Sequence, residues 1–79
     1  MIDVLFVLLP TSLILDWAGP AEALRIANRH LVAEGQPARF RLRFVGPRAE
    51  VVSSVGVQLA GVEPLPVYAS LRHSWVVVV

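Results

Sequence analysis

An unbroken apolar run at the start of the chain constrains the fold more than any other feature. Residues Ile2 to Leu9 are apolar except for Asp3, and the run is closed by Pro10. Such a run is typical of a strand in a parallel sheet that is covered on both faces. It has no basic segment before it, and Pro10, Thr11 and Ser12 interrupt it well short of the roughly 18 residues that a membrane span needs. It therefore predicts a buried strand, and neither a signal peptide nor a membrane anchor.

A helix is expected next. Pro20 follows Gly19 directly, and this pair predicts a helix start at that point because the missing N–H of proline costs nothing in the first turn. The helix should run to about Ala33 and end at Gly35, a suitable residue to follow a helix C-cap. Its apolar stripe is predicted to dock on a sheet and consists of Leu24, Ala27 and Leu31, with Ala23 and Ile26 alongside.

The segment Phe40–Val45 is predicted to be a second strand. Its apolar residues alternate with Arg41 and Arg43, and together with Arg39 these arginines are interpreted as the solvated side of the strand rather than as a phosphate-binding stripe. A strand, a crossover helix and a second strand form a βαβ unit, in which the two strands are parallel. The fold class predicted here is therefore α/β.

Shorter elements are predicted in the second half of the chain. Val51–Val52 and Val57–Leu59 are separated by turn residues and indicate a short hairpin at the margin of the sheet. Two prolines, Pro64 and Pro66, are expected to bound a loop, and Leu71–Ser74 to form a brief helical turn. The last five residues, 75–79, predict another fully apolar strand.

The final strand needs neighbours and covering layers, which this sequence does not supply. We therefore expect a truncated domain, of which residues 1–79 are the N-terminal portion. Periodicity places the following residues largely inside: Val4, Phe6, Leu8, Leu24, Ala27, Leu31, Phe40, Leu42, Phe44, Val76 and Val78.

Composition excludes several functions. The chain has no cysteine, which rules out disulfides, thiolate metal sites and a cysteine nucleophile within these residues. The net charge is +1 and the seven basic residues are dispersed arginines, a pattern that does not predict nucleic-acid binding. His30 and His73 have no partner at metal-ligand spacing, and Gly19 lacks the spacing of a dinucleotide fingerprint. We expect no metal, no cofactor and a cytoplasmic protein.

Several segments together resemble the ThiJ/PfpI-like (class I glutamine amidotransferase-like) domains. The segment of residues 13–29 reads LILDWAGPAEALRIANR and is similar to the first loop and helix of that family. Residues 44–47 (FVGP) and 52–57 (VSSVGV) resemble its hairpin, and residues 75–79 (WVVVV) resemble a later strand. The resemblance covers nearly the whole chain and implies part of a flavodoxin-like parallel sheet with a short hairpin.

Two functional branches share this beginning. One comprises AraC/XylS-type bacterial transcription regulators, which carry the domain as an N-terminal sensor. The sequence of residues 27–29 (ANR) favours this branch. It implies a small-molecule effector, a homodimer, and DNA binding only through a C-terminal region absent here. The other comprises enzymes of the isocyanide hydratase type. The resemblance, above all in the helix, and the lack of a basic patch make the regulator the leading hypothesis, while the absence of a nucleophile elbow from these residues argues against an enzyme.

Asp16 and Trp17 are the predicted site residues. In the enzymes of the family, an acidic residue in the loop before the first helix faces a cysteine, and Asp16 matches that acidic position; this makes it catalytic only if the parent protein is an enzyme. In a regulator, Asp16 and Trp17 would line a ligand pocket. The structural alternatives are that Asp16 stabilises the helix start and that Trp17 belongs to the core.

A third hypothesis is a purely structural fragment. Unpaired strands such as residues 75–79 invite association with another chain through their exposed backbone groups. Ser53 and Ser54 are interpreted as turn residues rather than nucleophiles, because they lack the surrounding glycines of a nucleophile elbow.

Overall fold

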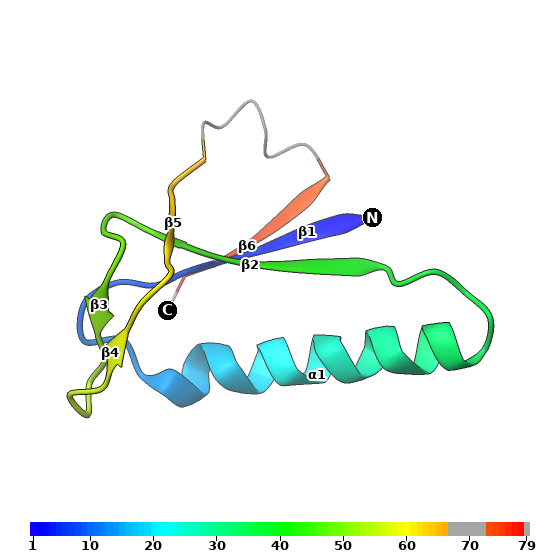
Figure 1. Cartoon of the computed structure of the whole chain (residues 1–79), viewed down its shortest axis with the longest axis horizontal. Coiled ribbons are helices and arrows are strands. Elements are labelled where there is room, and N and C mark those ends of the chain that lie inside the picture. Colours follow the sequence, from blue (N-terminus) through cyan, green and yellow to red (C-terminus); the bar gives the residue numbers. More distant parts are fainter. Residues whose placement is uncertain (67–72, 79) are drawn as a thin grey trace.

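One helix lies against one face of a small sheet (Figure 1). The computed structural model describes residues 1–66 and 73–78. The elements in chain order are β1 (Ile2–Val7), α1 (Ile14–Ala33), β2 (Phe40–Gly46), β3 (Val51–Val52), β4 (Gln58–Leu59), β5 (Glu63–Pro64) and β6 (Ser74–Val78). Within the described ranges, no helix is both long enough and apolar enough to cross a membrane.

The main sheet has the strand order β5-β2-β1-β6, and all its strands are parallel. Strand β1 is central, with Val4 in register with Leu42 of β2 on one side and with Trp75 of β6 on the other. The order β2-β1-β6 places the first strand between the second and a later one, as in a flavodoxin-like sheet. Strands β3 and β4 form a separate antiparallel hairpin. The predicted α/β class, βαβ unit and hairpin are confirmed.

The loop predicted around Pro64 contains a strand that sequence reasoning missed. Glu63 and Pro64 form β5, which pairs with Val45 and Gly46 at the end of β2. Proline is tolerated there because the strand lies at the edge of the sheet and is only two residues long. Of the predicted helical turn over residues 71–74, the first two residues lie outside the described residues, and Ser74 belongs to β6.

The helix begins six residues before the predicted start at Pro20. It starts at Ile14, and Pro20 is an interior residue that removes one backbone donor. Asp16 therefore lies in the first turn of α1 and not in a loop before it. The added turns bring Trp17 against Phe44 of β2, with ring centroids 5.6 Å apart. This tertiary contact stabilises the longer helix. The position of Pro20 in the sequence gives no indication of the contact.

The predicted end of α1 is confirmed. Glu34 is the C-cap, and Gly35 follows it with φ of 80°, a left-handed conformation that glycine adopts without a steric penalty. The N–H of Gln36 donates to the carbonyl of Leu31 at 2.8 Å, and that of Gly35 donates to Val32 at 3.0 Å. These two bonds form a Schellman motif, which satisfies carbonyl groups at the helix end.

The core lies between α1 and the face of the sheet that it covers. Val4, Phe6 and Leu8 are buried as predicted, and the rings of Phe6 and Phe44 stack with centroids 5.4 Å apart. The other predicted core residues of α1 and β2 are only partly buried, namely Leu24, Ala27, Leu31, Phe40, Leu42 and Phe44. Both predictions for β6 are wrong, since Val76 is 50% exposed and Val78 is 66% exposed. They lie on the edge strand, which has a strand partner on one side only among the described residues.

The apolar face of α1 is narrower than the sequence predicted. Ala23 and Ile26 were placed beside it, but both are exposed. The most buried helical residue is Ala21, one turn before Leu24. Because α1 crosses the sheet mainly over β2, only a narrow line of its residues reaches the sheet.

An asparagine ties the helix to the sheet. The Nδ2 group of Asn28 donates to the carbonyl of Phe40 at 2.7 Å, and its Oδ1 atom accepts the backbone N–H groups of Arg39 and Phe40, both at 3.0 Å. All three bonds go to Arg39 and Phe40, where the chain enters strand β2. Asn28 therefore fixes both the position of α1 and the start of β2.

Candidate functional site

Two loops meet at the carboxyl ends of the central strands. One joins β1 to α1, and the other contains the β3–β4 hairpin that follows β2. In open parallel sheets, ligands bind outside the carboxyl ends of the strands, next to the point where the strand order reverses. Here the chain passes from β1 to β2 on one side and later to β6 on the other, so β1 marks that point. A ligand site is therefore expected at this end of the sheet.

Backbone hydrogen bonds hold the two loops together. The N–H of Thr11 donates to the carbonyl of Val52 at 2.8 Å, and the N–H of Ser54 donates to the carbonyl of Ser12 at 3.0 Å. Thr11 has φ of 64°, an uncommon conformation for a residue with a branched side chain. Strained positions of this kind persist where surrounding contacts hold them, and they often occur at functional sites.

The hairpin turn is itself rigidly built. The buried Ser53 exchanges backbone bonds with the turn, and its Oγ atom accepts the N–H of Val57 at 3.1 Å. Ser53 is thus the turn residue that its sequence context predicts. The turn places Ser54 and Val55 beside the start of α1.

A hollow of about 400 Å³ lies between the start of α1 and this turn. It is lined by Leu13, Ile14, Leu15, Asp16, Ser54 and Val55. Most of these side chains are apolar, and the Asp16 carboxylate is the charged group among them. Large apolar side chains are unusually exposed here, since Leu15 is 83% exposed and Val55 is 75% exposed. An apolar hollow with one charged group is the usual composition of a small-molecule site.

The two predicted site residues point to different surroundings. Asp16 lines the hollow, is exposed, and its carboxylate forms no hydrogen bond or ion pair within the described residues. Trp17 packs edge-on against Phe44 and belongs to the margin of the core. Trp17 therefore supports the turn that carries Asp16, while Asp16 itself remains available to a ligand.

Two buried polar atoms beside this hollow have no partner within the described residues. They are the Oγ atom of Ser12, in the loop after β1, and the Nε1 atom of Trp17. A buried donor without a partner costs free energy, on the order of 1–3 kcal/mol. Ser12 and Trp17 flank residues 13–16 of the hollow in sequence. Buried side-chain atoms near Asp16 therefore lack hydrogen-bond partners within the described residues.

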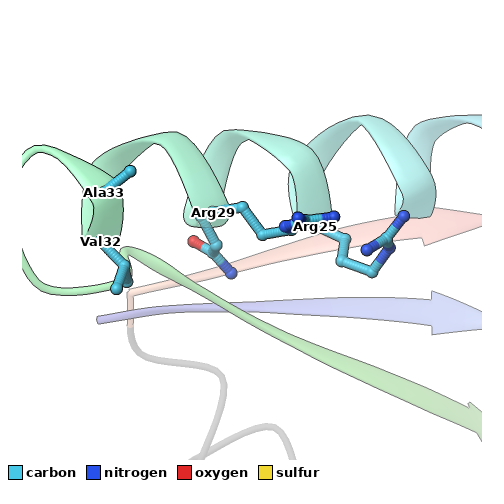
Figure 2. A pocket seen from close by; sticks show the side chains of 5 residues that line it. Arg25, Arg29, Val32 and Ala33 are labelled. Carbon is cyan, nitrogen blue, oxygen red and sulfur yellow. The ribbon is translucent and has the colours of Figure 1, made fainter.

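A second hollow runs along the C-terminal half of α1 (Figure 2). It measures about 420 Å³ and is lined by Arg25, Asn28, Arg29, Val32 and Ala33. Arg25 forms an ion pair with Glu22 at 2.8 Å, and the Asn28 amide is occupied by strand β2. Arg29 is the remaining cation of this hollow and has no partner within the described residues. A single exposed arginine on a helix surface does not by itself define a binding site.

The arginines of β2 form ion pairs on the face of the sheet opposite α1. Arg41 binds the carboxylate of Asp3, with Nη2 and Oδ2 2.9 Å apart, and Arg43 binds Glu63 at 2.8 Å. The hydrogen bond from Arg41 lowers the pKa of Asp3 below its ordinary value. Arg41 and Arg43 therefore cross-link neighbouring strands through ion pairs, which the prediction of a merely solvated strand face did not include. No cluster of metal-binding side chains occurs among residues 1–66 and 73–78.

Sequence reasoning identified Asp16 but missed the hairpin side of the hollow. Leu13, Leu15 and Val55 are far from periodic core positions, and no local motif marks them as pocket residues. Only the pairing of the two loops brings residues 13–16 together with residues 54–55.

Comparison with known proteins identifies the fold. No protein-family model and no curated protein matches this sequence. Among solved structures, the chain is similar to the crystal structure of an AraC family transcriptional regulator from Pseudomonas putida, with a TM-score of 0.71 and 21% sequence identity. The similarity covers 99% of this chain and 46% of that chain, so this chain spans about half the length of its structural neighbour. At this level of identity it shows the fold and confirms the flavodoxin-like α/β arrangement.

Proposed function

We propose that this chain is the N-terminal portion, residues 1–79, of a ThiJ/PfpI-like domain in an AraC-type bacterial transcription regulator. In this proposal the domain senses a small effector or mediates homodimer formation, and DNA is bound by a C-terminal region outside these residues. The protein would act in the cytoplasm without a cofactor. The observation that carries the proposal is the structural similarity to an AraC family regulator over almost the whole chain.

The hollow beside Asp16 supports the sensing role. It lies at the carboxyl ends of the parallel strands, it is mostly apolar, and its carboxylate has no competing partner among the described residues. We propose Asp16 as the group that orients the effector, with Trp17 as the residue that holds the first turn of α1 in place. The arginines are dispersed along the chain, and two of them form ion pairs with Asp3 and Glu63. This distribution favours a role without direct DNA contact for residues 1–79.

A ligand-binding experiment tests the sensing role. A panel of small metabolites would be screened for a rise in the melting temperature of the chain, and each hit would be repeated with Asp16→Asn. Glu22→Gln is the matched control, because Glu22 is also an exposed carboxylate on α1 but lies outside the hollow. We expect hits to weaken at least tenfold with Asp16→Asn and to persist with Glu22→Gln. Equal binding by all three proteins would remove Asp16 from the site.

The regulatory role is tested separately. The gene would be read beyond the codon for Val79, where a regulator requires helix-turn-helix patterns in an arginine-rich region. A gel-shift assay with residues 1–79 should show no binding to DNA. Binding of DNA by this chain on its own would contradict the proposal that a C-terminal region outside these residues binds DNA.

An enzyme of the isocyanide hydratase type is the second candidate. It is favoured by one observation, the accessible Asp16 carboxylate at the carboxyl end of the sheet. It requires a cysteine on a tight strand-to-helix turn beyond residue 79. In that case, Asp16→Asn in the complete protein should lower activity at least tenfold, equivalent to about 1.4 kcal/mol of transition-state stabilisation. Unchanged activity would exclude Asp16 from catalysis.

A further inference from the structure

The two halves of α1 are held in place to different extents. In the second half, the side chain of Asn28 makes three hydrogen bonds to Arg39 and Phe40, and the helix ends in a Schellman motif. In the first half, the N-cap residue is Leu13, whose side chain makes no capping hydrogen bond. Because an uncapped first turn leaves backbone N–H groups without a side-chain partner, the start of α1 is held less firmly than its end.

Pro20 separates the first turns of α1 from the rest of the helix. Proline has no backbone N–H, so the carbonyl of Asp16, four residues earlier, does not receive its helical hydrogen bond. The residue before a proline disfavours the α conformation, and here that residue is Gly19, which is also a poor helix former. Ala21, directly after Pro20, is the most buried residue of the helix. The helix is therefore weak between Gly19 and Pro20 and is packed into the core at Ala21.

Two buried polar atoms belong to the same part of the chain. The Oγ atom of Ser12 and the Nε1 atom of Trp17 are buried and have no hydrogen-bond partner within the described residues. Further chain packed around this unit can only cover more surface, so it brings no partner to atoms that are already buried. Because water satisfies both groups when they are exposed, their burial favours the opening of this part of the chain.

We propose that residues 13–19 form a hinged segment that opens and closes on the folded protein, while α1 stays docked from Ala21 onwards. One end of this hinged segment is fixed at Ser12, whose carbonyl accepts the N–H of Ser54 at 3.0 Å. The other end is the weak point at Pro20. Segments with few stabilising contacts are the ones that open locally in native proteins, without unfolding of the whole domain.

Opening of the hinged segment changes the hollow beside Asp16. When the segment is closed, Trp17 packs edge-on against Phe44, and Asp16 lines the hollow together with Ser54 and Val55. Opening moves Asp16 away from the hairpin turn and removes one wall of the hollow. A small molecule that fits the hollow would bind only the closed form and hold it closed. The hinged segment is thus a conformational device beside the candidate site, and its existence does not depend on the sensor role.

Hydrogen exchange of the complete protein, followed by NMR residue by residue, tests the hinged segment. In an α-helix, the amides of Ala18 and Gly19 donate to carbonyl groups inside the segment, whereas the amides of residues 24–31 donate to carbonyl groups outside it. We expect the protection factors of Ala18 and Gly19 to be at least tenfold lower than those of residues 24–31. Equal protection of the two groups of amides would overturn the proposal.

Variants at the two ends of the segment separate a hinge from ordinary fraying of a helix end. Pro20→Ala restores a backbone donor at an exposed position, and Leu13→Ser supplies a capping side chain. Each should raise the protection of both amides in the segment at least fivefold. Arg29→Ala is the matched control, because it raises helix propensity only in the second half of α1 and should leave these two amides unchanged.

The comparison of the two end variants decides the outcome. Circular dichroism checks that Pro20→Ala and Leu13→Ser have the fold of the unmodified protein. A gain in protection with Leu13→Ser but none with Pro20→Ala would show fraying from the helix end alone and would overturn a hinge at Pro20. An equal gain with Arg29→Ala would also overturn it, because the effect would then come from general helix propensity.

Discussion

The two faces of the main sheet are built on different principles. The face under α1 is apolar, with Val4 and Phe6 of β1 beside the aromatic residues of β2. The opposite face alternates ion pairs with aliphatic residues: Asp3 pairs with Arg41, while Leu5 and Val45 are buried beside them. Both sets come from the same strands, because successive side chains of a strand point to opposite faces.

This difference indicates where the stability of the chain originates. Burial of large apolar side chains contributes kilocalories per residue, whereas exposed ion pairs contribute between nothing and about 1 kcal/mol. A chain of this size is expected to have only about 4–12 kcal/mol of total stability. The buried apolar residues should therefore dominate the free energy of unfolding, and substitutions of the ion-paired residues on the opposite face should mainly change its dependence on pH.

The largest effect is expected from Phe6→Ala. Phe6 is fully buried and stacks on Phe44, so its removal leaves a cavity under α1 and should cost about 3–5 kcal/mol. Leu15→Ala is the control, because Leu15 is exposed and its loss should change stability by no more than about 0.5 kcal/mol. Urea denaturation followed by circular dichroism measures both. A cost below about 1 kcal/mol for Phe6→Ala would show that the helix-covered face is not the main source of stability.

A smaller but still large effect is expected at the end of β2. A Cβ atom on Gly46 would lie 2.7 Å from the backbone oxygen of Leu8 and 3.1 Å from Val62. Because backbone cannot move aside easily, Gly46→Ala should destabilise the fold by about 1–3 kcal/mol. At Gly19, in α1, an added Cβ meets no atom within 4 Å apart from its chain neighbours and the nearby helix backbone, so Gly19→Ala should stabilise the helix by about 0.5–1 kcal/mol. Thermal melts of the two variants should shift in opposite directions, and a shared direction would refute the steric argument.

Loss of the tie between α1 and β2 should have an intermediate effect. Asn28→Ala leaves the carbonyl and amides at the start of β2 without their side-chain partner, at a cost of about 1 kcal/mol. The matched variant is His30→Ala, two residues further along the helix and exposed. Hydrogen exchange adds a local readout, since the Phe40 amide should lose protection only in Asn28→Ala. If its protection is unchanged, the helix is held to the sheet by packing alone.

The smallest effect is expected on the opposite face and is visible only in acid. The hydrogen bond from Arg41 lowers the pKa of Asp3 in the folded chain below its ordinary value of 3.8. The pair therefore contributes stability above that value, and this contribution is lost as the pH falls through the lower, folded pKa. Asp3→Asn should flatten the fall of stability below about pH 4, and Arg41→Ala should do the same. If the double variant flattened it further than either single one, the two residues would not act as a pair.

Much of the fold was predictable because its signals are local. Three predictions that rest on a few neighbouring residues were confirmed: the strand from the apolar run of β1, the strand from the alternation in β2, and the helix end from the glycine after α1. The start of α1 was predicted wrongly because Pro20 is a strong local signal, whereas the contact between Trp17 and Phe44 that extends the helix is tertiary. The candidate site was predictable only in part. Asp16 could be named from the resemblance, but its neighbours on the hairpin could not.

The sequence by itself determined the order of the longer elements, the parallel pairing of β1 and β2, and which side of β2 is apolar. These properties follow from hydrophobic periodicity and from the conformational limits of glycine, both of which act over a few residues. Only the tertiary structure decided that β5 pairs with the end of β2, that β6 lies exposed at an edge, and that the two loops meet around Asp16. Those outcomes depend on backbone pairing between distant segments. Backbone groups are the same in every residue except proline, so the sequence does not specify their partners directly.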